Sequence, residues 1–254
     1  FVIQILCACF FSVAELWIND LYGLLGIYAI PNWIGIPFTI LTIVFITNAI
    51  NLIDGIDGLA SGLSSVALLV FGLLFIEKGL WMYSMLAFST LGVLVPFFYY
   101  NVFGNAERAR KIFMGDTGSL TIGIMLCFLS IKLSLYTPTR DTFLYNPAAL
   151  AFSPLMIPCL DVVRVFIHRI RMKKNPFMPD KSHIHHKLLA LGMPQRKAMV
   201  TIVSLSLIFS LCNVVLSQYI NINLLLIMDI LVWTGANIWL TNKIEHRNLN
   251  PNYR

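Results

Sequence analysis

Long apolar runs separated by short polar stretches dominate the 254-residue chain. A helix needs roughly 20 apolar residues to cross the hydrocarbon core of a bilayer, and eight runs approach this length. These runs cover residues 2–18, 34–52, 59–77, 81–100, 118–136, 148–168, 198–219 and 222–241. Trp17, Trp33 and Tyr136 lie near run ends, as aromatic residues do at membrane interfaces. The pattern predicts an all-α, polytopic transmembrane bundle with about eight spans.

Composition supports a membrane protein over its competitors. Apolar residues make up 58% of the chain, charged residues only 12%, and the mean hydropathy is +0.78. A soluble domain carries about 45–50% apolar and about 25% charged residues. So few charges cannot cover a water-exposed surface, which argues against an ordinary soluble enzyme or a disordered chain. We expect one integral membrane domain over residues 1–254.

The positive charges are distributed unevenly between the two predicted membrane faces. The net charge is +6. Fourteen lysines and arginines lie in the loops 101–117 and 169–197 and in the tail after residue 241, whereas the opposite loops contain only Lys78 and Arg140. Cytoplasmic loops carry such an excess, so this face is predicted to be cytoplasmic. The basic balance therefore reflects topology, and we expect no nucleic-acid partner.

A first polar motif ends the run 34–52. Asn48, Asn51, Asp54 and Asp57 recur every three residues, and a glycine follows each aspartate. Residues three apart share a helix face, and ionisable groups at membrane depth mark functional sites by default. The motif predicts a polar floor for a nucleotide or a metal; the alternative is a capped helix end with a glycine-rich turn.

A second motif, Phe113–Ser119, opens the next cytoplasmic-side span. Asp116 stands between two glycines in the sequence Phe-Met-Gly-Asp-Thr-Gly-Ser. A carboxylate at a helix start can hold Mg²⁺, which prefers few carboxylates together with substrate phosphates. Backbone N–H groups there can bind a phosphate. The alternative is that Asp116 is an N-cap.

Three of the five histidines lie within four positions of the basic loop 169–197. His183, His185 and His186 follow Asp180 and Lys181. Imidazole and ammonium groups together can neutralise a diphosphate, so phosphate or nucleotide binding is favoured. A zinc site and a solvated surface cluster are the alternatives.

Two further sets of polar residues lie inside predicted spans. Asp161 and Arg164 are three apart, which allows a salt bridge or a function on one helix face. Asp229 is expected to make an interhelical hydrogen bond, and Lys132 to extend toward the interface.

In their order and common face, the three motifs resemble those of the polyprenyl-phosphate N-acetylhexosamine-1-phosphate transferases, membrane enzymes that start bacterial surface glycans. The resemblance covers about residues 1 to 220, and the form His-Ile-His-His is similar to the branch that uses UDP-N-acetylglucosamine. It implies that undecaprenyl phosphate attacks the β-phosphorus of UDP-N-acetylglucosamine, or of another UDP-N-acetylhexosamine, and that UMP leaves. It also implies Mg²⁺, with Mn²⁺ as the alternative ion, and a bacterial cytoplasmic membrane with the active site on the cytoplasmic face.

The resemblance also assigns roles to individual residues. Asp116 would be the Mg²⁺ ligand, and Asp54 and Asp57 would position the nucleotide sugar or assist catalysis. The implied substrate-binding residues are Asn48 and Asn51 in the cavity wall, Asn101 and Phe113 at the nucleotide, and Lys181, His183, His185 and His186 at the phosphates or sugar.

The chain departs from the family in two respects. It contains no Asp-Asp pair, and it has about eight predicted spans where the family has about ten or eleven. We therefore expect a chain that lacks about three N-terminal helices and is inactive alone. The implied partners are the lipid acceptor, the nucleotide sugar and the bilayer, with room for a homodimer. A transporter and a non-catalytic scaffold are the competing classes; polar residues gathered on one face disfavour the transporter.

Overall fold

The structure, a computed structural model, describes residues 2–105, 107–135, 146–175 and 182–249. Within these ranges seven helical segments are long and apolar enough to cross a membrane, which confirms the all-α polytopic class. They are α2 (Asn32–Ile53), α3 (Leu59–Glu77), α4 (Trp81–Phe103), α5 (Gly115–Ser134), the segment Pro147–Arg171, α9 (Gln195–Leu216) and α10 (Ile222–Leu249).

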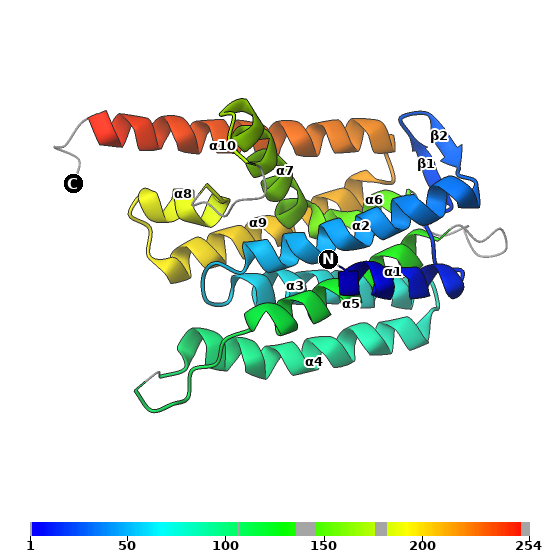
Figure 1. Cartoon of the computed structure of the whole chain (residues 1–254), viewed down its shortest axis with the longest axis horizontal. Helices are drawn as coiled ribbons and strands as arrows, with labels where there is room; N and C mark the ends of the chain where they lie inside the picture. Colours follow the sequence, from blue (N-terminus) through cyan, green and yellow to red (C-terminus); the bar gives the residue numbers. More distant parts are fainter. Residues whose placement is uncertain (1, 106, 136–145, 176–181, 250–254) are drawn as a thin grey trace.

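Helix α3 forms the centre of the bundle and is buried along most of its length. It packs on α4, α5 and α9 (Figure 1). Small residues allow close approach: the Phe88 ring lies against Gly72, and Val203 lies against Gly62. Helices in a bilayer associate through such packing, because lipid is as apolar as the side chains it would replace.

The first predicted span is shorter than expected. Helix α1 covers only Val2–Val13, and 12 residues extend about 18 Å, less than a bilayer core. The chain then turns back along α2, where the backbone N–H of Ile18 donates to Thr39 Oγ1 at 2.8 Å and Trp17 packs against Gly35. The prediction of a helix over 2–18 is therefore corrected, because residues after 13 contact α2 instead of extending α1.

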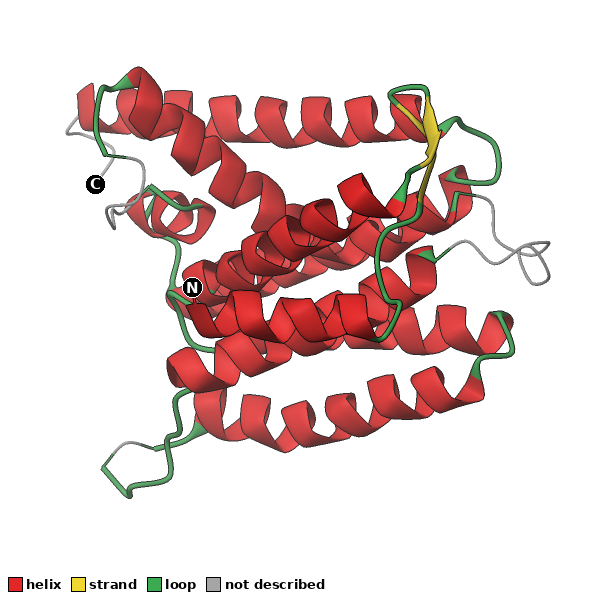
Figure 2. Ribbon diagram, turned by 45° about the vertical axis from the view of Figure 1, so that its right-hand side comes forward, coloured by secondary structure: helices red, strands yellow, loops and turns green. Residues whose placement is uncertain are grey.

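A small hairpin follows that the hydropathy pattern did not predict. Strands β1 (Asp20–Leu24) and β2 (Ile27–Ala29) pair antiparallel at one end of the bundle (Figures 1 and 2). Leu25 and Gly26 connect them, both at positive φ, as tight hairpin turns require.

The predicted continuous run 148–168 is interrupted. It consists of α6 (Pro147–Phe152), the 3₁₀ turn η1 (Ser153–Leu155) and α7 (Met156–Arg171). Pro154 has no backbone N–H and cannot continue the α-helical hydrogen bonding, so the direction changes there. This break sends α7 across the bundle toward α10 (Figure 1).

The motif-bearing segments gather at one end of the bundle. The α2–α3 turn, the α4–α5 loop and the short helix α8 (Ile184–Ala190) lie there, together with the C-terminal end of α10 (Figure 1). The hairpin and the α3–α4 turn lie at the other end. The distribution of lysines and arginines along the sequence predicts that these segments lie on one face.

Candidate functional site

A polar cavity of about 350 Å³ lies between the α2–α3 turn and the start of α5. Six of the predicted site residues line it, although they come from three separate parts of the sequence. The lining consists of Asn51, Asp54, Gly55, Ile56, Asp57, Asn101, Phe113, Met114, Gly115 and Asp116.

The α2–α3 turn owes its shape to a glycine and to an asparagine on α4. Gly58 has a φ of +78°, a left-handed conformation that suits glycine, and a Cβ there would collide with Val102. Asn101 Oδ1 accepts a 2.6 Å hydrogen bond from the Gly58 N–H, and its Nδ2 donates to the Ile112 carbonyl at 2.8 Å. Asn101 therefore holds the turn and the α4–α5 loop together at the cavity.

Asp116 lies in the first turn of α5, where it is joined to α2. Met114, not Asp116, is the N-cap residue, so the capping alternative is not what the structure has. Asn51 Nδ2 donates to Asp116 Oδ1 at 3.1 Å and to Ser119 Oγ at 2.9 Å. Ser119 belongs to the second motif, but its residue type alone gave no reason to predict this contact.

Asp57 is paired with Lys111, a residue that the sequence indicated only as part of the positive charge of the loop 101–117. Lys111 Nζ lies 2.6 Å from Asp57 Oδ2 and 5.5 Å from the centroid of the Phe113 ring. Phe113 is 72% exposed and lines the cavity mouth as an available aromatic face. A cation therefore already stands beside one of the three carboxylates.

Burial and electrostatic repulsion within the cavity both act on the carboxyl group of Asp54. Burial, assisted by the charges of Asp57 and Asp116, raises the pKa of Asp54 above its ordinary value of 3.8. No group of three metal-ligating side chains occurs among the described residues. The donor set nevertheless fits Mg²⁺, which uses one or two carboxylates and takes its remaining oxygens from water and substrate phosphates.

Asn48 is not brought to the cavity. Its Nδ2 donates to Gln4 Oε1 on α1 at 3.1 Å and to the Val44 carbonyl at 2.7 Å. It contributes to packing of α1 on α2 in this structure, one helical turn away from the residues that line the cavity.

The three histidines lie behind the Gly55 turn and are absent from the cavity lining. His183 is paired with Asp161, and the His185 ring packs directly on Gly55. His185 is 1% exposed, and neither ring nitrogen has a hydrogen-bond partner among the described residues. Burial, with the neighbouring His186 and His183, lowers the pKa of His185 to about 4. Lys181 lies outside the described residues.

The predicted contact between Asp161 and Arg164 is present, with Arg164 Nη2 lying 2.8 Å from Asp161 Oδ1. The expected interhelical hydrogen bond of Asp229 is also present, since Asn213 Nδ2 donates to its Oδ2 at 2.8 Å. Lys132 Nζ lies 5.1 Å from the centroid of the Tyr83 ring.

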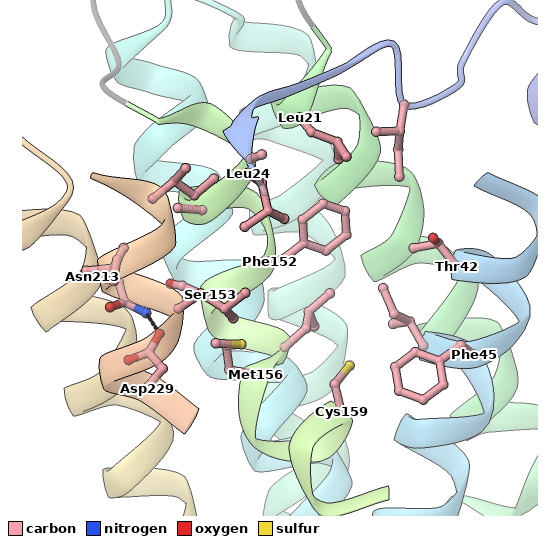
Figure 3. A pocket seen from close by; sticks show the side chains of 18 of the residues that line it. Leu21, Leu24, Thr42, Phe45, Phe152, Ser153, Met156, Cys159, Asn213 and Asp229 are labelled. Atoms are coloured by element: carbon pink, nitrogen blue, oxygen red, sulfur yellow. Dashed lines mark hydrogen bonds between the residues drawn. The ribbon is translucent and has the colours of Figure 1, made fainter. Parts of the chain in front are cut away.

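A second, apolar cavity of about 260 Å³ lies between α2, α6, α7, α10 and β1 (Figure 3). Leu24, Phe45, Phe152 and Met156 point into it, and the Asn213–Asp229 pair stands at one side. None of the sequence-predicted site residues lines it.

Comparison with known proteins finds a matching family and several bacterial relatives. The profile of glycosyl transferase family 4 matches residues 1–134. The probable undecaprenyl-phosphate N-acetylglucosaminyl 1-phosphate transferase of Bacillus subtilis is 37% identical over 85% of this chain and 58% of its own length. The undecaprenyl-phosphate alpha-N-acetylglucosaminyl 1-phosphate transferase of Yersinia pestis is 30% identical over 80% of this chain and 54% of its own.

The decaprenyl-phosphate N-acetylglucosaminephosphotransferase of Mycobacterium leprae is 36% identical over 71% of this chain and 48% of its own length. The chain thus spans about half the length of these relatives. The family profile covers just over half of the chain and includes the α2–α3 turn and the start of α5. This chain belongs to glycosyl transferase family 4.

Proposed function

We propose that the protein containing this chain transfers N-acetylglucosamine-1-phosphate from UDP-N-acetylglucosamine to undecaprenyl phosphate. A phosphate oxygen of the lipid attacks the β-phosphorus of the nucleotide sugar. The bond from that phosphorus to the bridging oxygen breaks, and UMP leaves with this oxygen. The product, undecaprenyl-diphospho-N-acetylglucosamine, would start a bacterial cell-surface glycan.

The observation that carries the proposal is the convergence of Asp54, Asp57 and Asp116 in one polar cavity at the end of an apolar bundle. A lipid phosphate stays at the membrane surface and a nucleotide sugar arrives from water, so their meeting point must be polar and open at a bundle end. The names of the bacterial relatives support the choice of lipid and sugar.

Two anionic substrates repel each other, and the cavity lining is itself acidic. A divalent cation would offset both effects, and we propose Mg²⁺ held by Asp116 with Asp54 or Asp57 nearby, with Mn²⁺ as a substitute. When bound, such an ion stabilises charge on the transferring phosphoryl group. The chain's own residues would then position the substrates, which is most of what phosphoryl transfer asks of a protein.

The remaining residues are proposed to orient the donor. Phe113 offers an exposed aromatic face to the uracil, and Asn51 fixes the carboxylate of Asp116. Lys111, beside Asp57, is placed to contact a phosphate. We propose that His183, His185, His186 and Lys181 assist at the phosphates or sugar, the histidines by way of the Gly55 turn.

The test is an assay of the complete gene product with undecaprenyl phosphate, radiolabelled UDP-N-acetylglucosamine and Mg²⁺, with and without EDTA. Labelled lipid and UMP in equal amounts, both abolished by EDTA, are expected. Labelled lipid formed only from another UDP-N-acetylhexosamine would change the sugar and keep the reaction. Substrate flux into liposomes without UMP release would overturn the proposal in favour of a transporter.

A further inference from the structure

Asp161 on α7 is the most fully bonded buried carboxylate among the described residues, and most of its partners belong to another segment. Its side chain is 0% exposed. Oδ2 lies 2.8 Å from His183 Nδ1, and the Ile184 N–H lies 3.2 Å from both oxygens. Oδ1 also accepts from Arg164 Nε at 3.2 Å and Nη2 at 2.8 Å.

A buried carboxylate is expensive unless it is paired and hydrogen-bonded, especially in a chain that spans a membrane. Arg164 offsets the charge of Asp161 and also donates from Nη2 to the Ser182 carbonyl at 2.6 Å. Asp161 and Arg164, both on α7, therefore hold three consecutive residues, 182–184, immediately before and at the start of α8.

The held segment leads directly to the polar cavity. The His183 and His185 rings are nearly parallel, at 5°, with centroids 5.9 Å apart. His185 packs on Gly55 so closely that a Cβ at Gly55 would collide with its Nε2. Gly55 lines the cavity between Asp54 and Asp57. A continuous series of contacts thus runs from Asp161 to the carboxylates.

We infer that Asp161 is a positioning residue, which fixes the histidine segment against the Asp54–Gly58 turn by way of His183 and the first residue of α8. The inference rests on the proposed function. An ionised carboxylate only accepts hydrogen bonds, so it requires a proton on Nδ1 of His183 and holds the ring in one orientation.

The test is a double-mutant cycle in the complete gene product, with D161N, H183A and D161N/H183A. Asparagine replaces one accepting oxygen with a donating NH₂ group and removes the charge. D161N should lower kcat/KM for UDP-N-acetylglucosamine by about 10–100-fold, as loss of an outer partner of a functional histidine does. In the H183A background the same change should cost only about two- to fivefold, because the path through His183 is already removed and the one through the Ile184 N–H remains.

Hydrogen exchange provides a readout independent of turnover. D161N should speed exchange in residues 182–190 and leave α9 unchanged, whereas D229N should leave exchange in residues 182–190 unchanged. Asp229 is the matched control, a buried carboxylate bonded to an amide in the other cavity. Should H183A turn over too slowly to measure, the cycle is determined from the shift in melting temperature induced by UDP-N-acetylglucosamine.

D161N leaves Arg164 without its carboxylate, which can prevent folding. In that case D161N/R164M, which removes both charges, replaces D161N in every comparison. Any one of four results would overturn the inference: wild-type activity in D161N, full activity in H183A, losses that multiply fully in the double variant, or unchanged exchange over 182–190. If the wild-type protein transfers no sugar phosphate, the proposed function fails, and the exchange experiment alone decides on Asp161.

Discussion

The polar and the apolar cavity both contain carboxylates, but these are in opposite situations. In the apolar cavity Asp229 is a single acid that accepts a hydrogen bond from Asn213, with aliphatic and aromatic side chains around it (Figure 3). In the polar cavity three acids share one space of about 350 Å³, and burial together with the charges of Asp57 and Asp116 raises the pKa of Asp54. Among the described residues, Lys111 is the cation that pairs with one of these acids.

This contrast separates an acid that joins two helices from the three acids that we propose to be functional. Asp229 joins α9 to α10 and is satisfied by that contact, as interhelical polar pairs in membranes are. The three acids of the polar cavity are arranged against their mutual repulsion, which costs stability unless a cation or ligand relieves it. Substitutions should therefore separate the two cavities by activity.

Asp116→Asn should give the largest effect. The amide keeps the size and can still bond Asn51, but it removes the charge that we assign to the metal. We expect turnover to fall about 10³-fold or more at unchanged expression. The measurement is UMP release in purified protein across a Mg²⁺ titration. Lys78→Ala, at the opposite end of the bundle, is the control and should leave turnover unchanged. Equal losses in both variants would refute the site assignment.

Asp54→Asn should lower activity and raise stability together. Because the folded state raises the pKa of Asp54, this group holds its proton to higher pH in the folded chain than in the unfolded one. Its ionisation therefore weakens folding as the pH rises through the raised pKa, and not at pH values below 3.8.

The neutral amide should accordingly raise the melting temperature at pH 7.5 and have less effect at pH 4, while kcat falls roughly 100-fold. Thermal melts of the ligand-free protein at both pH values, beside the turnover assay, measure this. A lowered melting temperature at pH 7.5 would contradict the repulsion argument.

Gly55→Ala should disturb the polar cavity through the contact between the Asp54–Gly58 turn and His185. The added methyl group would collide with His185 Nε2, so the ring or the turn must shift. We expect about a tenfold loss of kcat/KM for the nucleotide sugar, since small misplacements in positioned sites are costly. Gly92→Ala is a matched control, because Gly92, like Gly55, does not have a positive φ and has nothing within 4 Å of its added Cβ. Equal kinetics in the two variants would mean that the contact between His185 and Gly55 does not influence the polar cavity.

The sequence predicted the bundle and the cavity unevenly, for physical reasons. Hydropathy is local along the chain, so the positions of most spans followed from it, and the distribution of lysines and arginines predicted that the motifs share one face. Breaks such as Pro154, and the return of Trp17 and Ile18 onto α2, depend on tertiary contacts and were missed. Lys111 carries no local signal beyond charge, and the spacing around Asp161 predicts only its contact with Arg164. The contacts of Lys111 with Asp57 and of Asp161 with His183 are evident only from the fold.

Lys111→Met should have a smaller effect, confined to substrate binding. Methionine keeps much of the length and the packing on Phe113 but removes the cation beside Asp57. Since the pair is partly exposed, we expect a several-fold rise in KM for UDP-N-acetylglucosamine with kcat little changed. The rise should shrink at high salt, where the lysine is screened in the wild type. A salt-independent loss of kcat would instead assign Lys111 to the chemical step.

Asp229→Asn should have the smallest effect and is the variant that most directly tests the comparison. The amide can still accept a hydrogen bond from Asn213 Nδ2. No charged partner of Asp229 appears among the described residues. Turnover and KM should stay within about twofold of wild type, because the apolar cavity contains none of the proposed catalytic groups. Asp229→Leu, which cannot accept that bond, should lower the melting temperature while leaving the turnover of the folded fraction intact. A large loss of turnover in Asp229→Asn at unchanged stability would mean that the apolar cavity takes part in the reaction. It would also mean that a hydrogen-bond partner within the chain does not by itself identify a carboxylate as structural.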